Sequence, residues 1–391
     1  MTAFGAAESS WDALAAAQQP RWGAHPAYHR ARRTLSAAAP LVSMAELRGI
    51  RREIAAVAAG EARLLQLGDC AESFFECTPH HTDEKLGTLD RIAGEWERVG
   101  GRDVVRIGRI GGQFAKPRSA TTERHGDREL PAFRGHLVNS EVPTPSARQH
   151  DPRRMLWAYE ASAKVLAQVG AHRRASGGRG PWSSHEALVL DYEEPLLRTD
   201  PVTGKTYLAS THFPWIGVRT HQPDLAHVRM LATVANPVGC KVGPATDHET
   251  VLRLCEILDP DREPGRLVLI ARMGARLVAD ALPGIVRAVR DAGHPVVWLS
   301  DPMHGNTVTT PSGHKTRHLS DIVAEVTAFR SVVTEAGLYP GGLHLEVAAS
   351  DVTECVGGPV RDEHEVPSRY TSLCDPRLNL EQAMEVVTRW V

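Results

Sequence analysis

The sequence predicts a (β/α)8 barrel, and two observations support this prediction. Short runs rich in Val, Ile and Leu recur along the chain, and near-continuous apolar runs are typical of parallel strands covered on both faces. Segments with helical periodicity separate several of these runs, which is the alternation that parallel α/β folds require. A doubly wound open sheet is the alternative, because both folds share this alternation.

Each expected strand is bounded by Gly, Pro or polar residues. We expect strands at 64–69, 104–109, 187–193, 212–217, 240–244, 267–272, 295–301 and 343–348. Segments with the apolar spacing of a helix follow several of them. We expect helices at 83–99, 222–235, 246–258, 280–292, 318–336 and 378–390. Eight strands alternating with helices favour the closed barrel.

Three stretches depart from a minimal barrel. Residues 110–186 are too long for one crossover, so we expect an elaborated second β–α connection. Residues 194–211 are short and rich in turn residues, which predicts a hairpin or an irregular third connection. We expect residues 1–63 to be an N-terminal helical extension, with helices near 10–18 and 44–59, that caps the barrel or contacts another subunit. Residues 64–391 are then the catalytic barrel domain.

The composition excludes several classes of protein. Lys plus Arg number 45 against 47 for Asp plus Glu, so the broad basic surface of a nucleic-acid-binding protein is not expected. The six cysteines include no CxxC pair, which argues against a zinc ribbon and a disulfide scaffold. No signal peptide and no apolar run of about 18 residues are present, so we expect a cytoplasmic protein without a membrane span.

Four cations follow expected strands. Since the strands of a barrel end at one rim, where active sites lie, these side chains are expected to converge. They are Arg109, Arg219, Lys241 and Arg272. Such a set suits an anionic ligand that carries both phosphate and carboxylate. The alternative is that each cation forms a structural ion pair with a nearby carboxylate.

A second group of residues at the same rim has metal-ligating side chains. Cys70 follows the first strand, His304 follows the seventh, Glu346 ends the eighth, and Asp375 lies beyond it. Thiolate, imidazole and carboxylate together suit Mn²⁺, Fe²⁺, Co²⁺ or Zn²⁺ better than Mg²⁺. Taken singly, a residue such as Cys70 is more often a buried structural thiol, and one such as His304 is more often a hydrogen-bonded loop residue.

Further polar residues near the rim have two interpretations. Residues 111–119 form a Gly-rich basic segment that could hold a second phosphate through backbone and side chains, or remain a solvated loop. A second basic segment, 313–317, lies near His304 with the same two interpretations. Asp191 and Glu193 are expected at the end of the third strand. Glu325 and Arg330 are expected on a solvated helix face.

Ten sequence blocks occur in the order expected of one known family. They are LGDCAESF (67–74), GRIGGQFAKPRS (108–119), SHEALVLDYE (184–193), THFPWIGVRT (211–220), ANPVGCKVGP (235–244), RMGA (272–275), GHPVVWLSDPMHGNT (293–307), GGLHLE (341–346), DVTECVGG (351–358) and CDPRLN (374–379). With QQPRW at 18–22, they closely resemble the class II 3-deoxy-D-arabino-heptulosonate 7-phosphate (DAHP) synthases. The resemblance covers nearly the whole chain.

The resemblance implies a (β/α)8 barrel that joins phosphoenolpyruvate to erythrose 4-phosphate, releases phosphate, and uses a divalent metal, usually Mn²⁺ or Co²⁺. Motif by motif, the implied metal ligands are Cys70, His304, Glu346 and Asp375. The implied phosphoenolpyruvate cations are Arg109, Arg219, Lys241 and Arg272. The implied aldose phosphate residues are Lys116, Arg118, Ser119 and Lys315. Glu186 and Trp215 match positions that line the same cavity.

The chain departs from the family pattern at three places. Val218 stands where many members have Glu, which is one candidate for orienting the attacking water, and His136 stands where Asp is common. The segment between Arg109 and Arg219 is shorter than in members regulated by aromatic amino acids, and resembles those of phenazine-type pathways. An amino-DAHP synthase with an iminosugar phosphate acceptor and a non-catalytic partner barrel are the alternatives. A homodimer or higher homo-oligomer is expected.

Overall fold

Eight parallel strands close into a barrel in the computed structural model, which describes residues 11–177 and 179–391. Their order around the barrel is β1, β2, β5, β8, β9, β10, β11 and β14, with β14 pairing back to β1. The strands are β1 (Arg63–Gly68), β2 (Val104–Arg109), β5 (Trp182–Glu186), β8 (Phe213–Ile216), β9 (Val238–Val242), β10 (Leu267–Ala271), β11 (Val297–Ser300) and β14 (Pro340–Glu346). The predicted closed barrel is confirmed.

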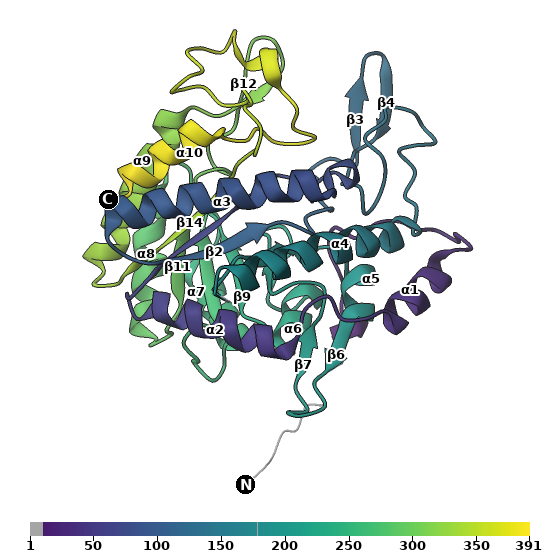
Figure 1. Ribbon diagram of the computed structural model, residues 1–391, viewed down its shortest axis with the longest axis horizontal. Coiled ribbons are helices and arrows are strands. Elements are labelled where there is room, and N and C mark those ends of the chain that lie inside the picture. Colours follow the sequence, from purple (N-terminus) through teal and green to yellow (C-terminus); the bar gives the residue numbers. More distant parts are fainter. Residues whose placement is uncertain (1–10, 178) are drawn as a thin grey trace.

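A ring of helices surrounds these strands (Figure 1). Its members are α3 (Pro79–Gly100), α4 (Arg154–Ala175), α5 (Leu190–Glu193), α6 (Ala226–Ala232), α7 (His248–Leu258), α8 (Val278–Asp291), α9 (Leu319–Glu335) and α10 (Leu380–Arg389). The apolar faces of these helices other than α4 and the outward side chains of the strands form one buried cluster, which includes Trp96, Leu254 and Val286. The apolar residues of α4 belong to two neighbouring clusters. None of the described helices combines the length and the apolar character that a membrane span requires.

The third strand lies earlier than the sequence predicted. The apolar run 187–193 is outside the sheet, where Leu188, Val189 and Tyr192 pack into a satellite core beside the barrel. The strand β5 has the polar sequence WSSHE, and it is nevertheless buried because its side chains bond inside the barrel. Ser184 Oγ, for example, donates to the Gly108 carbonyl at 2.9 Å.

Antiparallel hairpins occur in three of the described connections, and one of them, β12 (Val308–Thr309) paired with β13 (Lys315–Thr316), lies between β11 and α9. The second connection contains β3 (Thr122–His125) paired with β4 (Arg128–Pro131), followed by α4, and the third contains β6 (Leu197–Thr199) paired with β7 (Thr206–Leu208). Figure 1 shows the β3–β4 and β6–β7 hairpins at opposite ends of the molecule. The elaborated second connection and the hairpin in the third agree with the prediction.

The helix α2 (Met44–Ala58) lies across the amino-terminal end of the barrel. Its buried face of Leu47, Ile50, Ile54 and Val57 belongs to the same core cluster as Val268 and Val297 of the strands. The helix expected near 10–18 is wrong in extent: the structure has only a 3₁₀ turn at Trp11–Ala13, and residue 10 lies outside the described residues. The helix α1 (Tyr28–Ala37), which lies beside α4 and α5, was not predicted.

Candidate active site

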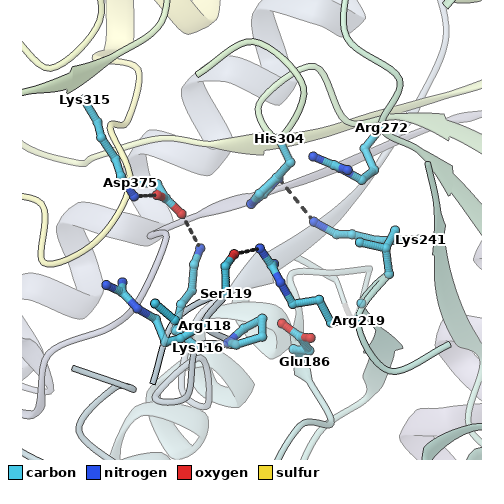
Figure 2. A pocket seen from close by; sticks show the side chains of 14 residues that line it. Lys116, Arg118, Ser119, Glu186, Arg219, Lys241, Arg272, His304, Lys315 and Asp375 are labelled. Carbon is cyan, nitrogen blue, oxygen red and sulfur yellow. Dashed lines mark hydrogen bonds and ion pairs between the residues drawn. The ribbon is translucent and has the colours of Figure 1, made fainter. Parts of the chain in front are cut away.

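One cavity of about 280 Å³ lies over the carboxyl ends of the barrel strands. It is lined by Lys116, Pro117, Arg118, Ser119, Ala120, Glu186, Gly217, Val218, Arg219, Lys241, Arg272, His304, Lys315 and Asp375. Figure 2 shows the cationic side chains facing inward from several loops. Six of these side chains are Lys or Arg and two are carboxylates, so the cavity suits an anionic ligand.

The predicted metal ligands converge beside this cavity. Ligand atoms of Cys70, Glu346 and Asp375 all lie within 4.8 Å of one another, and His304 Nε2 lies 3.2 Å from Glu346 Oε1. One thiol, one imidazole and two carboxylates are a donor set that fits a divalent transition metal. The structure brings these residues together from the ends of β1, β11 and β14 and from the loop before α10.

Basic side chains keep the carboxylates of this cluster ionised. Burial opposes ionisation of Glu346, but His304, Lys116 and Arg317 outweigh it and hold its pKa well below the ordinary range. Arg317 Nη2 donates to Glu346 Oε2 at 2.9 Å, and Lys116 Nζ lies 3.1 Å from Asp375 Oδ2. Burial raises the pKa of Cys70 well above its usual range, although Lys116, whose Nζ lies 2.9 Å from Cys70 Sγ, opposes the shift.

His304 is oriented by Asp301, the residue that directly follows β11. Burial opposes ionisation of Asp301, yet His304 and Lys241 hold its pKa well below the ordinary value. His304 Nδ1 therefore donates to the Asp301 carboxylate at 2.8 Å, which leaves Nε2 facing Glu346. Such a carboxylate partner is common behind metal-binding imidazoles. Sequence reasoning overlooked this role, although Asp301 precedes His304 by three residues, a spacing that could have revealed it.

Three of the four predicted phosphoenolpyruvate cations line the cavity: Arg219, Lys241 and Arg272. The alternative of structural ion pairs applies to Lys241, whose Nζ lies 2.7 Å from Asp301 Oδ2. Among the residues that the structure describes, Arg219 and Arg272 form no ion pair with a carboxylate. Arg219 instead donates to Ser119 Oγ at 2.6 Å.

Arg109 and Trp215 do not reach the cavity wall. The Arg109 guanidinium is buried and lies 5.1 Å from the ring of Trp215. It donates to the carbonyls of Asp69 and Cys70, to His344 Nε2 at 2.7 Å and to Glu346 Oε1 at 3.1 Å. Arg109, at the end of β2, thus connects the ends of β1 and β14 beneath the cavity.

Three of the predicted aldose phosphate residues lie across the cavity from the predicted phosphoenolpyruvate cations, whereas Ser119 lies between the two groups and accepts from Arg219 (Figure 2). Lys116, Arg118 and Ser119 come from the second connection, and Lys315 comes from the strand β13 (Lys315–Thr316). Arg118 Nη2 pairs with Glu123 Oε2 at 2.7 Å, which anchors it to the β3–β4 hairpin. Lys315 Nζ lies 2.8 Å from Asp375 Oδ1, as drawn in Figure 2.

Glu186 ends β5 and faces the cations from below (Figure 2). Burial raises the pKa of this carboxyl, although Lys241 and Lys116 oppose the shift. Its Oε1 atom is buried and accepts no hydrogen bond from the described residues. A Cβ on Gly217 would lie 2.3 Å from Oε1, so only glycine at 217 leaves room for the carboxyl. Glu186 is therefore an unpartnered polar group aimed at the cavity.

Asp191 and Glu193, expected at the rim, lie elsewhere. Asp191 accepts from Trp22 Nε1 at 2.8 Å and from Tyr28 OH at 2.5 Å, so it fastens the N-terminal segment. Glu193 pairs with His185 Nε2 at 2.8 Å in the interior. Both predictions were wrong because the sequence analysis placed the third strand at 187–193, whereas the strand is 182–186.

His136 supports the loop after β1 and does not line the cavity. Its Nδ1 accepts from the Phe74 backbone N–H at 2.9 Å, and its Nε2 bonds Glu141 Oε2 at 2.6 Å. Val218, the other departure from the family pattern, does line the cavity. It places an apolar side chain beside Arg219.

Together the fold and the site define a barrel enzyme with a polycationic cavity beside a candidate metal centre. The family model described as "Class-II DAHP synthetase family" matches residues 6–180 and 177–390. This chain belongs to that family.

Relatives and a solved structure agree with this assignment. A "Probable phospho-2-dehydro-3-deoxyheptonate aldolase" of Pseudomonas fluorescens is 49% identical over 380 residues, covering 96% of this chain and 94% of the relative. The "Phospho-2-dehydro-3-deoxyheptonate aldolase" of Streptomyces coelicolor is 40% identical, covering 97% and 95%. A solved aldolase of the same description from Francisella tularensis matches with a TM-score of 0.54 and 13% identity, covering 92% of this chain and 97% of that chain, which supports the fold.

Proposed function

We propose that this chain is a DAHP synthase that condenses phosphoenolpyruvate with erythrose 4-phosphate and serves a secondary pathway. One observation carries the activity: a metal-capable cluster and six Lys or Arg side chains surround one cavity of about 280 Å³. The family supports the same reaction, which is the first step of the shikimate pathway. The shortened second connection motivates the assignment to secondary metabolism.

The two substrates are assigned to opposite sides of the cavity. Phosphoenolpyruvate contacts Arg219, Lys241 and Arg272, with Glu186 below it and Arg109 stacked on Trp215 beneath the floor. The phosphate of erythrose 4-phosphate contacts the aldose side: Lys116, Arg118, Ser119 and Lys315. This division places the aldehyde end between the metal centre and phosphoenolpyruvate.

The metal is assigned as Mn²⁺ or Co²⁺, held by Cys70, His304, Glu346 and Asp375. The mixed soft and hard donor set supports this choice over Mg²⁺. When bound there, the metal supplies Lewis acidity toward the aldehyde oxygen. Asp301 keeps His304 in the tautomer whose Nε2 can bind the metal.

The side chains of the cavity account for the remaining chemistry. Arg219, Lys241 and Arg272 hold the polyanionic substrate so that its C3 faces the aldehyde carbon, and they stabilise charge on the departing phosphate. Water must add at C2 after the new carbon–carbon bond forms. Glu186 Oε1 is the unpartnered acceptor below this position, and we assign it to receive the water proton, since Val218 offers no acid.

A metal-dependent assay with both substrates tests the proposal. Purified enzyme treated with chelator should lose DAHP formation, and added Mn²⁺ or Co²⁺ should restore it, with phosphate released in equal amount. Turnover of erythrose 4-phosphate separates this activity from that of an amino-DAHP synthase. Absence of product with every metal, while phosphoenolpyruvate still binds, would contradict the proposal and favour the non-catalytic partner barrel.

Three broader assignments belong to the same proposal. We infer a homodimer or higher homo-oligomer, which light scattering on the purified protein measures. We infer a cytoplasmic location, supported by six cysteines that are all free thiols. We keep residues 1–63 as an extension and 64–391 as the catalytic barrel, and because α2 packs into the barrel core, we expect limited proteolysis to remove at most the residues before α2 without unfolding the barrel.

A further inference from the structure

A buried carboxylate on α9 lies outside the cavity and has no assigned role. Glu325 is 1% exposed, although the sequence predicted a solvated helix face. Its Oε1 accepts the backbone N–H groups of Met273 and Gly274, each at 2.9 Å, and its Oε2 accepts from Asn306 Nδ2 at 2.7 Å. Three donors from two loops therefore meet on one carboxylate.

These two loops carry residues of the candidate active site. Met273 directly follows Arg272, and Asn306 lies two residues after His304. Asn306 extends the connection, because its Oδ1 accepts the Ala275 N–H at 2.9 Å and its Nδ2 also donates to the Pro302 carbonyl at 2.8 Å. Glu325 and Asn306 thus form a clamp across the ends of β10 and β11.

The loop backbones inside this clamp are in direct contact. A Cβ on Gly305 would lie 2.4 Å from Gly274 N, and Gly274 has φ +85°. Side chains at these positions would force the loops apart. The spacing between the loops is therefore set by glycine contact and by the shared carboxylate.

Burial of the Glu325 carboxylate lowers the stability of the fold, which a positioning role would explain. Among the described residues no cation pairs with Glu325, and burying a carboxylate without a counter-ion is unfavourable. Burial accordingly raises its pKa to about 7, although the N–H groups of Gly274 and Met273 oppose the shift. An apolar residue at 325 would remove this cost but would leave three buried donors unpaired.

We propose that Glu325 is a positioning residue for the synthase reaction, which fixes Arg272 relative to His304 and so aligns phosphoenolpyruvate with the metal centre. Glu325 touches neither substrate and acts through the two loops. The inference rests on the proposed assignment of Arg272 and His304. It makes no claim on the aldose phosphate residues: three of them lie on the second connection, and Lys315 lies nine residues after Asn306, in β13.

Glu325→Gln is the primary test, because glutamine keeps the size but turns one acceptor into a donor that faces Asn306 Nδ2. Affinities for phosphoenolpyruvate and for Mn²⁺ are measured by calorimetry, and the two KM values are measured at saturating metal. We expect phosphoenolpyruvate binding and its KM to worsen by about tenfold, as for loss of a charge-assisted contact. Metal affinity should fall as well, while the KM for erythrose 4-phosphate should stay within about twofold.

Glu335→Gln is the matched control, since Glu335 is exposed on the same helix. It should leave every constant at the wild-type value. Asn306→Asp tests the clamp from the other loop, because it places two carboxylates together and should impair phosphoenolpyruvate binding. The double variant Glu325→Gln with Asn306→Asp restores a donor–acceptor pair and should recover part of the lost affinity. That rescue distinguishes positioning from general destabilisation.

Wild-type phosphoenolpyruvate and Mn²⁺ affinities in folded Glu325→Gln would overturn the inference. Equal losses for both substrates, or a double variant worse than either single variant, would also overturn it. If Glu325→Gln does not fold, Asn306→Asp and the double variant decide by the same readouts. Binding is measured without turnover, so an inactive wild-type enzyme would contradict the proposed reaction while leaving this test intact.

Discussion

At the scale of single residues, the cavity cations fall into two kinds. Lys241 and Lys116 have carboxylate partners within ion-pair distance, whereas Arg219 and Arg272 have none among the described residues. A cation that already has a partner contributes less to binding, because the ligand replaces an existing interaction. The two arginines are therefore expected to provide most of the affinity for an anionic substrate.

Arg272→Ala should raise the KM for phosphoenolpyruvate sharply and lower kcat/KM by about a hundredfold, or roughly 3 kcal/mol, because a charge-assisted contact is lost. Steady-state kinetics with each substrate varied in turn measures the effect. Lys315→Ala is the comparison, and it should act mainly on the KM for erythrose 4-phosphate. Unchanged kinetics in Arg272→Ala would show that this arginine has only a structural role.

Cys70 and Cys374 should form a disulfide when the metal-free enzyme meets a mild thiol oxidant such as diamide. Cys374 directly precedes Asp375, whose backbone N–H donates to Cys70 Sγ at 3.2 Å, and a bound metal would withdraw the Cys70 thiolate from exchange. We expect loss of activity that metal prevents and dithiothreitol reverses. Peptide mass mapping measures the bond, and Cys374→Ser should resist inactivation. A free Cys374 thiol in the inactive material would refute the pairing.

At the scale of elements, the interior of the barrel explains what the sequence could and could not predict. Seven of the eight strands were predicted near their positions because apolar runs mark them. The strand β5 was missed because Ser183, Ser184 and His185 are buried as hydrogen-bonded polar groups, a pattern that sequence periodicity does not distinguish from a loop. The buried Glu325 was missed for the same reason.

Three of the four proposed metal ligands stand at the end of a strand or just after one, so the sequence pattern could point to them. The fourth, Asp375, lies farther along, in the loop before α10. Arg109 was placed correctly at the end of β2, but its burial under the cavity depends on His344 and Glu346, which are distant in sequence. A local sequence pattern does not reveal contacts between residues so far apart in the chain. The positions of Arg109 and Trp215 beneath the floor therefore required the structure.

The helix α2 provides a stability test at the same scale. Glu46 completes a capping box with Ser43 and also contacts Arg173. Burial opposes its ionisation, but His212 and Ser43 lower its pKa below the ordinary 4.5. A lowered carboxyl pKa stabilises the fold above the unfolded value of 4.5 and loses that effect as pH falls.

Glu46→Gln should accordingly lower the free energy of unfolding at pH 7 by about 1 kcal/mol, because glutamine can still close the capping box but cannot form the ion pair with Arg173. The difference from wild type should shrink as the pH falls below 4.5. Urea unfolding at pH 7 and pH 4 measures it. A difference that stays constant over this range would show that the charge of Glu46 is not involved.

At the scale of the whole molecule, the second connection is the longest segment between two described barrel strands. It contains one exposed hairpin, β3–β4, and one long helix, α4, packed beside α3. Arg118 and Arg148 share Glu123 of that hairpin, so the connection supports the aldose side of the cavity. The β3–β4 hairpin therefore helps to hold Arg118 at the cavity.

We expect no strong inhibition by Phe, Tyr or Trp, singly or combined, because the segment 110–211 is short compared with the regulated members that it resembles. Initial rates at subsaturating substrate, with each amino acid up to millimolar concentration, measure the effect. Inhibition at micromolar concentration by any of the three would place a regulatory site elsewhere in the molecule.

The pairing of β1 with β14 has a consequence for biosynthesis. Cys70 and Asp375, which meet at the candidate metal centre, are separated by 305 residues. At about 5–20 residues per second, a ribosome delivers the second of them on the order of 15–60 s after the first. During that interval the nascent chain holds Cys70 without Asp375, and so no complete metal site. The site is completed only when the loop between β14 and α10 reaches Cys70, so a chain terminated before Asp375 lacks one of the four proposed ligands.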